Sequence, residues 1–378
     1  MANRGRVLAM ALRHRLRRLL GRPVNAFADT PAGLALSPSA RHFADYGYAP
    51  LGLRFQSLRP ADAQAWQRQA RGKLAELAGY RREAVRPQSV GEDRFVLPNG
   101  LERRRIYLRV REGVDIPIHL IAPPDAAGPM PVMLCLQGTN SGAHISWGEA
   151  RFPADLEKAD GDYAIALQAA QRGYLAIAIE QSCFGERSER QIKPRSAAPC
   201  VDATMHALLL GRSLLGERCS DVSAAIDWLQ AEAGALRIDA SRIHAMGHSA
   251  GGSVALFAAA LDERISAVLA CGCIGYIRDT IGRRRDDQGQ NVIPGILNWL
   301  EMGDILGLVA PRILVSVAGE GDPIWPAEGA RAAFAEAAEI YAALGASERL
   351  SLLAEPGGHR FRPGPSWQAL QSILNKCY

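Results

Sequence analysis

One serine of this chain stands where its side chain could act as a nucleophile. Ser249 lies in the segment Gly247–Gly252, whose sequence Gly-His-Ser-Ala-Gly-Gly contains a G-x-S-x-G pattern. Residues 242–246 before it favour a short buried strand, and the Ala-rich residues 253–261 after it favour a helix. Ordinary glycine-rich turns also match this pattern, but the flanking strand and helix predict a nucleophile elbow.

The elbow requires glycine for steric reasons. The turn holds the serine in a strained backbone conformation, and side chains two positions before and after it would collide. Gly247 and Gly251 occupy those two positions. The helix that begins at Ala250 then directs its N–H groups and its dipole toward the Ser249 hydroxyl.

A serine nucleophile needs a base, and that base needs a carboxylate to orient it. Asp322 follows the predicted strand 311–318, and His359 follows the next predicted strand, 349–354. The carboxyl ends of parallel strands meet at one edge of a sheet, where reactive groups collect. The order Ser, Asp, His is that of α/β hydrolases. We therefore expect His359 to accept the proton of Ser249 and Asp322 to hold the imidazole.

The acid and the base each have alternatives. Glu320 competes with Asp322 as the acid, and Asp322 fits better because Pro323 fixes the turn that follows it. Among eight histidines, His359 alone follows the last predicted strand in a glycine-rich loop. Two other histidines remain candidates for contact with a substrate: His144 and His248.

The oxyanion hole should combine two backbone N–H groups near the nucleophile. One is the N–H of Ala250. The other is expected in the loop after the predicted strand 132–136, where Thr139 follows Gly138. A plain Gly-Thr-Asn turn is the alternative interpretation of that loop.

Arg187 lies in a polar loop, residues 181–202, after the predicted strand 174–179. One hypothesis is that its planar fork of donors binds a carboxylate or sugar hydroxyl of the substrate. The alternative is an ion pair that holds the loop closed, with three candidate partners: Glu180, Glu186 or Asp202.

The rest of the pattern alternates strands and helices, which predicts a mainly parallel central sheet with helices on both faces. Further strands are expected at residues 103–111, 114–122 and 264–271. Helices are expected at residues 61–80, 162–172, 203–215, 216–232, 327–344 and 366–377. Residues 276–308 interrupt the alternation, and we interpret them as an insertion over the active-site face.

The first 60 residues differ from the rest. A basic amphipathic helix is predicted from five leucines at helical spacing: Leu8, Leu12, Leu16, Leu19 and Leu20. A secretory signal, a transit peptide and a surface-lying helix or disordered arm are the competing interpretations, and the last is preferred. Prolines through residues 22–60 favour an irregular segment. We therefore expect an extension, 1–60, and a hydrolase domain, 61–378.

Composition excludes several classes of protein. Residues 1–28 hold seven Arg and no acid, and subtracting these from the net charge of +5 leaves −2 for the rest, which gives no reason to expect nucleic-acid binding. No apolar run approaches the roughly 18 residues of a transmembrane segment. The seven cysteines form no C-x-x-C pair, which favours a reducing compartment, taken as the cytoplasm, without disulfides.

Five segments carry a resemblance to a known family: Phe184–Arg187, Gly211–Glu217, Gly247–Gly252, Gly319–Ile324 and Pro356–Phe361. The chain resembles the α/β-hydrolase superfamily, and within it the branch of dienelactone hydrolases and acetyl xylan esterases, near the cephalosporin-C deacetylases. The matching segments lie within residues 100–375. Such proteins usually have His-Gly at the oxyanion loop, whereas this chain has Gln137-Gly138.

The resemblance and the residues together predict a serine hydrolase of carboxylic esters. Its substrate would be a small-molecule or saccharide ester with an acetyl or other short acyl group, and neither metal nor organic cofactor is expected. An oligopeptidase-like serine peptidase and a non-catalytic binding protein on the same scaffold are the alternatives. The oligomeric state stays open.

Overall fold

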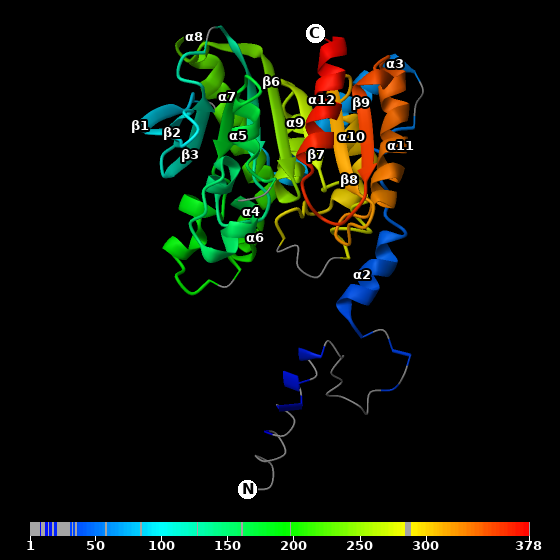
Figure 1. The fold of residues 1–378 in the computed structure, drawn as a ribbon. Coiled ribbons are helices and arrows are strands. Elements are labelled where there is room, and N and C mark those ends of the chain that lie inside the picture. The colour runs from blue at the N-terminus through cyan, green and yellow to red at the C-terminus, as the bar shows by residue number, and fades with distance from the viewer. Residues whose placement is uncertain are drawn as a thin grey trace. The chain divides into compact units, whose positions relative to one another are not determined.

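The structure is a computed structural model. It describes all residues except 1–7, 9–11, 14, 17–18, 21–30, 32, 35, 57–58, 84, 127, 160–161, 197, 284–288 and 378. The chain divides into two compact units, Met1–Gly47 and Tyr48–Tyr378. All the strands that the structure describes belong to the second unit (Figure 1).

The strands of the second unit form one nine-stranded sheet. They are β1 (Gln88–Val96), β2 (Glu102–Arg111), β3 (Val114–Ala122), β4 (Met130–Leu136), β5 (Leu175–Ile179), β6 (Ile238–His248), β7 (Ile265–Cys271), β8 (Ile313–Gly319) and β9 (Leu350–Glu355). Their order across the sheet is β1-β2-β3-β5-β4-β6-β7-β8-β9. All neighbours from β5 to β9 pair in parallel, whereas β1, β2 and β3 pair antiparallel and β3 meets β5 antiparallel. This is the mainly parallel sheet that the sequence predicts.

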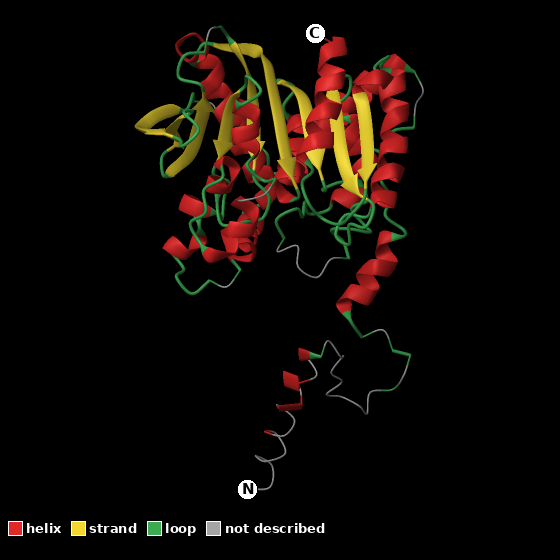
Figure 2. Ribbon diagram, viewed as in Figure 1, coloured by secondary structure: helices red, strands yellow, loops and turns green. Residues whose placement is uncertain are grey.

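Helices cover both faces of the sheet (Figure 2). One face packs against α3 (Pro60–Ala78), α7 (Leu214–Ala231), α9 (Ala250–Leu261), α10 (Met302–Gly307) and α11 (Ala327–Ala343). The other packs against α5 (Ile165–Ala170) and α12 (Pro363–Cys377). Successive strand residues point to opposite faces, so Leu134 of β4 joins the first core and Cys135 the second. The remaining helices whose bounds the structure describes are α2 (Pro38–Tyr46), α4 (Leu156–Ala159), α6 (Pro199–Leu209) and α8 (Ala233–Leu236).

The second unit begins before the boundary expected at residue 61. Leu53 and Phe55 are buried in its core. The Phe55 N–H donates to Asp304 Oδ1 at 2.9 Å, and the Trp66 indole N–H donates to the Leu53 carbonyl at 2.6 Å. Proline content alone therefore places the boundary too late, because apolar residues between the prolines pack on α3 and α10.

Several elements differ from the sequence prediction. The edge strand β1 was not expected, because its residues are mostly exposed and carry no alternating apolar pattern. Helix α2 lies where irregular chain was expected. Helix α6 begins inside the expected loop 181–202, and α5 is shorter than the expected helix 162–172. The expected insertion 276–308 contains α10 and a turn of 3-10 helix, Ile296–Asn298.

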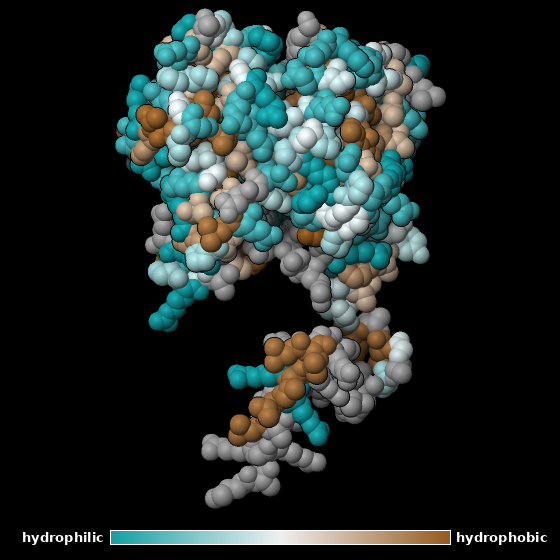
Figure 3. All heavy atoms as spheres, in the orientation of Figure 1, coloured by the Kyte–Doolittle hydropathy of each residue, from teal (hydrophilic) through white to brown (hydrophobic). Residues whose placement is uncertain are grey.

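The expected amphipathic helix lies mostly outside the described residues. Its described residues include helical positions, and its five leucines are between 54% and 84% exposed. Hydrophobic side chains gather in the first unit on the surface view (Figure 3). Among the described residues, no helix is both long enough and apolar enough to cross a membrane.

Candidate active site

The turn from β6 to α9 has the geometry of an elbow. Ser249 sits between them with φ 57° and ψ −127°, in the region of positive φ that side chains disfavour. A Cβ at Gly247 would lie 2.3 Å from the carbonyl carbon of Gly251, and one at Gly251 would lie 2.0 Å from the Leu136 oxygen. The steric requirement for glycine at both positions is therefore confirmed. The Ser249 N–H donates to the Cys271 carbonyl at 2.9 Å, which ties the elbow to β7.

His359 links Ser249 to Asp322. Its Nε2 lies 3.0 Å from the Ser249 Oγ, and its Nδ1 lies 2.7 Å from Asp322 Oδ2. The three residues follow β6, β8 and β9, so the sheet brings together the residues expected as nucleophile, acid and base (Figure 1). Glu320, the alternative acid, instead pairs with Arg331, and its side chain is 47% exposed.

Asp322 is held as a carboxylate. Its Oδ1 accepts the N–H groups of Ile324 at 2.8 Å and Trp325 at 3.0 Å, while Oδ2 faces His359. Burial raises the pKa of Asp322, but the hydrogen bonds from His359 and the two N–H groups outweigh burial and hold that pKa below its ordinary value. Asp322 is therefore ionised at neutral pH and can orient the Nδ1–H of the imidazole.

His248 packs against His359 from within the protein. The two rings are 4.6 Å apart between centroids, and His248 is buried. Burial, helped by the charge of His359, lowers the pKa of His248 to about 3, so its ring is neutral at physiological pH. Its Nε2 has no hydrogen-bond partner among the described residues. The structure thus places His248 as a support for the His359 ring rather than at a surface where substrate could reach it.

The loop after β4 lies against the elbow. A Cβ at Gly138 would come 2.8 Å from the His248 carbonyl oxygen and 3.5 Å from the Ser249 Cβ, so glycine permits the close approach. Thr139 follows at once, and Ala250 is the first residue of α9. The first N–H groups of a helix have no acceptor inside it, so the N–H of Ala250 is free to face a ligand beside Ser249. Both predicted oxyanion donors therefore lie on segments adjoining the nucleophile.

Glu180 supports this loop from the end of β5, a role that the sequence did not suggest. Its Oε1 accepts the Ala143 N–H at 3.0 Å and the side-chain amide of Gln137 at 3.3 Å. A Cβ at Gly185 would lie 2.1 Å from Glu180 Oε2, so the following loop also passes close to this carboxyl. Burial raises the pKa of Glu180 to about 7. Gln137 thus anchors the loop through Glu180.

Arg187 forms an ion pair and does not line the cavity described below. Its Nη1 lies 2.6 Å from Asp221 Oδ2 and donates a hydrogen bond to the Glu180 carbonyl oxygen at 3.1 Å. The two charged side chains are only 17% and 12% exposed. The geometry favours the ion-pair alternative, but Asp221 on α7 is the carboxylate partner, in place of the three candidates expected from the sequence.

Replacing Arg187 by alanine should lower the free energy of unfolding by about 1–3 kcal/mol, because Asp221 would lose its charged donor while remaining largely buried. Chemical denaturation of the two proteins measures this difference. Arg331→Ala is the matched control, since its pair with Glu320 is about half exposed and should change stability by less than about 0.5 kcal/mol. A protein that keeps its stability but loses affinity for anionic esters alone would instead restore the substrate-binding hypothesis.

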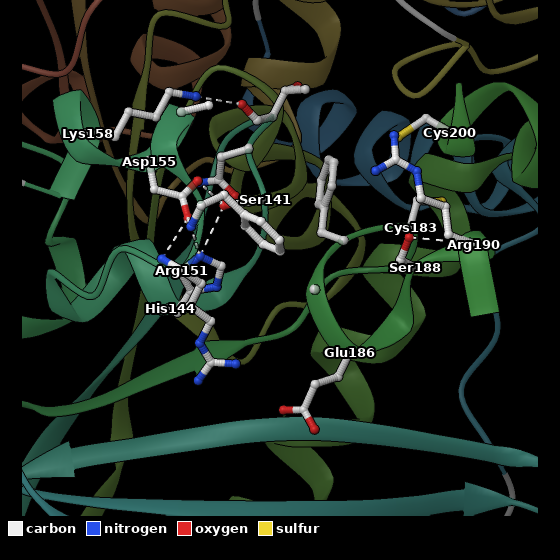
Figure 4. Close-up of a pocket in the computed structure, with 16 residues that line it drawn as sticks. Ser141, His144, Arg151, Asp155, Lys158, Cys183, Glu186, Ser188, Arg190 and Cys200 are labelled. Carbon is white, nitrogen blue, oxygen red and sulfur yellow. Dashed lines mark hydrogen bonds and ion pairs between the residues drawn. The ribbon is translucent and has the colours of Figure 1, made fainter. Parts of the chain in front are cut away.

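A cavity of about 840 Å³ begins at Thr139 and extends past the loop after β5 (Figure 4). His144 lines it, as expected, but its Nε2 is engaged with Asp155 Oδ2 at 2.9 Å and Ser141 Oγ at 3.0 Å. Ser141 also donates to Asp155 Oδ1 at 2.5 Å. The two ring nitrogens of His359 contact different partners, Ser249 and Asp322, so that ring can pass on a proton. A single nitrogen of His144 contacts both of its partners, so this ring cannot pass a proton between them. It fixes the wall of the cavity.

The described residues include no group of three or more His, Cys, Asp and Glu side chains placed to hold a metal ion. None of the seven cysteines forms a disulfide in the structure. The groups that the site does offer are a serine hydroxyl hydrogen-bonded to an imidazole, backbone N–H donors, and a cavity whose lining includes Thr139 of the adjoining loop. These can carry out nucleophilic acyl transfer with the side chains of this chain.

The chain matches the BD-FAE family over residues 209–295. This match includes the elbow with Ser249 and ends before Asp322 and His359. A protein of Bacillus subtilis, named "Putative hydrolase YtaP", is 26% identical over 245 residues, which are 64% of this chain and 77% of that protein.

Two solved structures with the same architecture carry esterase names. A "putative acetyl xylan esterase" of Bacteroides fragilis superposes with a TM-score of 0.69 at 18% identity, covering 87% of this chain and 84% of that one. A CE15 glucuronoyl esterase from Teredinibacter turnerae gives a TM-score of 0.58 at 17% identity, covering 96% and 98%. These likenesses confirm the α/β-hydrolase fold that the sequence predicts.

Proposed function

We propose that this protein is a serine hydrolase of carboxylic esters, with Ser249 as nucleophile, His359 as base and Asp322 as orienting acid. The observation that carries the proposal is the continuous contact from the Ser249 hydroxyl through the imidazole to a buried carboxylate, with distances of 3.0 Å and 2.7 Å. Such a chain of contacts activates a serine that is otherwise a weak nucleophile at neutral pH. The strained elbow adds support, because strain is maintained chiefly where it serves a site.

The reaction follows from this geometry in two halves. The Ser249 Oγ attacks the ester carbonyl carbon while its proton passes to His359 Nε2, and the oxyanion meets the N–H groups of Ala250 and Thr139. The imidazolium, stabilised by Asp322, then gives that proton to the departing alcohol as the carbon–oxygen bond breaks. Water repeats the sequence on the acyl-enzyme, with His359 again as base, and releases the acid.

The acyl group is proposed to be acetyl or another short chain, and the alcohol a small molecule or saccharide. The names of the structural neighbours, an acetyl xylan esterase and a glucuronoyl esterase, support an ester of a carbohydrate. The resemblance to dienelactone hydrolases and a cytoplasmic location stay predictions. An oligopeptidase-like activity is the second candidate from the sequence, but no structural observation favours it.

A panel of nitrophenyl esters with acetyl, butyryl and longer chains, set beside peptide anilides, tests the proposal. We expect the acetyl or butyryl ester to be turned over and the anilides to be left intact. Labelling by a fluorophosphonate probe should accompany that activity, because the probe reacts with an activated serine. Turnover of anilides alone would favour the peptidase, and the absence of both turnover and labelling would favour a non-catalytic binding protein.

A further inference from the structure

The cavity beside Thr139 is far larger than an acetyl group needs, so it can hold the alcohol part of a substrate. Five charged side chains line it besides His144: Arg151, Asp155, Lys158, Glu186 and Arg190. Their hydrogen bonds and ion pairs decide which charge is left for a ligand, because a charge that already has its partner gains little from a second one.

Both carboxylates that line the cavity, Asp155 and Glu186, already have hydrogen-bond donors within the protein. Asp155 accepts from Ser141 at 2.5 Å and from the N–H groups of Arg151 and Phe152, with His144 beside it. These hydrogen bonds outweigh burial and lower the pKa of Asp155 to about 2. Asp155 therefore needs no cation from the ligand.

The second carboxylate, Glu186, turns toward the strands below the cavity (Figure 4). Its Oε2 accepts the Tyr107 hydroxyl proton at 2.7 Å and lies 3.4 Å from Arg105 Nη1. Among the cations, Arg151 pairs with Glu149 at 2.9 Å. The positive charge that remains belongs to Lys158 and Arg190, which Figure 4 shows on opposite sides of the cavity.

Lys158 differs from the lysines whose ammonium groups pair with carboxylates, such as Lys73 with Glu76 and Lys193 with Asp202. Its Nζ donates to the Thr139 carbonyl at 3.0 Å, and no carboxylate lies within ion-pair distance among the described residues. Its side chain is partly buried, and desolvation lowers its pKa even though Asp155 and Glu157 act on it from further away. A partly dehydrated ammonium with a single neutral acceptor is suited to receive an anion.

Lys158 also contacts the loop that adjoins the nucleophile. Its acceptor, Thr139, adjoins Gly138, whose Cβ position would be 3.5 Å from the Ser249 Cβ. Its charge is also one of those that lower the pKa of His248, the ring packed on His359. A substrate held by Lys158 would therefore lie along the loop that adjoins Ser249.

We propose that the cavity binds the alcohol part of an ester that carries a carboxylate, and that the ammonium of Lys158 binds this carboxylate. The proposal rests on the proposed ester hydrolase activity and names its substrate class. Arg190, which is exposed and donates to the Ser196 carbonyl at 3.2 Å, adds positive charge on the opposite wall. Phe152, 56% exposed at the same cavity, offers an aromatic face to a sugar or aryl ring.

The test compares two acetyl esters of equal size that differ in charge, para-acetoxybenzoate and the neutral para-acetoxybenzamide. The measured quantity is the ratio of their kcat/KM values. Lys158→Gln should lower this ratio by about tenfold, the loss expected for one partly desolvated charge pair, and Lys158→Arg should keep most of it. Lys193→Gln is the matched control and should leave the ratio unchanged, because Lys193 pairs with Asp202 away from the cavity lining.

Each other outcome has a defined meaning. If Lys158→Gln lowers kcat/KM equally for both esters, Lys158 only positions the oxyanion loop through Thr139, and the carboxylate subsite is wrong. If the unaltered protein hydrolyses neither these esters nor the nitrophenyl panel, the proposed function fails. Binding of para-hydroxybenzoate to the Ser249→Ala protein, measured by titration calorimetry, then still tests the subsite. Equal affinity with and without Lys158→Gln would overturn it.

Discussion

The Ser249→Ala protein is expected to lose ester turnover by about 10⁶-fold in kcat while keeping its fold. The loss is this large because the three residues act as a unit, and without the hydroxyl neither the imidazole nor the oxyanion donors have an attacking atom to assist. The fold should survive because the side-chain hydrogen bond that the structure shows for Ser249 is the one to His359. Steady-state kinetics with nitrophenyl acetate measure the loss, and circular dichroism checks the fold.

Ser241→Ala is the matched control for this variant. Ser241 lies on the same strand, β6, but is exposed and bonds only to Asp239 among the described residues. It should retain full turnover. A folded Ser249→Ala protein that still hydrolyses the ester would remove Ser249 from the mechanism and show that another residue carries the activity.

The elbow and its partners could be predicted because each depends on local sequence or on strand order. Gly247 and Gly251 are required by contacts within the turn itself and with the strand beside it. Asp322 and His359 follow consecutive parallel strands, so their proximity to Ser249 is a consequence of topology. The choice between Asp322 and Glu320 also depends on local sequence. In the turn after Asp322, two backbone N–H groups bind its carboxylate and hold it toward the protein interior.

The parts that the sequence did not indicate depend on contacts between distant segments. Asp221 lies on α7, 34 positions from Arg187, and no spacing rule connects a loop arginine to a helix carboxylate. Glu180 and Lys158 act through burial and through backbone groups of the oxyanion loop, and such environments leave no periodic pattern. A glutamate at the end of an otherwise apolar strand was the available signal for Glu180, because a buried carboxyl needs hydrogen-bond partners.

Asp322→Asn is expected to reduce kcat/KM by about 10⁴-fold with little change in fold. The two backbone N–H groups of Ile324 and Trp325 fix the orientation of the side chain, because their acceptor must be an oxygen. The amide nitrogen of the new residue would then face His359 Nδ1 and donate to it. The imidazole would be forced to carry its proton on Nε2, and Nε2 could no longer accept the proton of Ser249.

Glu320→Gln provides the comparison, because it makes the same chemical change two residues away. Glu320 pairs with Arg331 at the surface, so its loss should alter neither the imidazole tautomer nor the rate by more than about twofold. Measuring kcat/KM for both variants at several pH values separates a tautomer effect from a simple shift in ionisation. A tautomer effect persists across these pH values, because raising the pH does not return the proton to Nδ1. A larger loss in Glu320→Gln than in Asp322→Asn would show that Glu320 is the orienting acid and that the Asp322 contact is incidental.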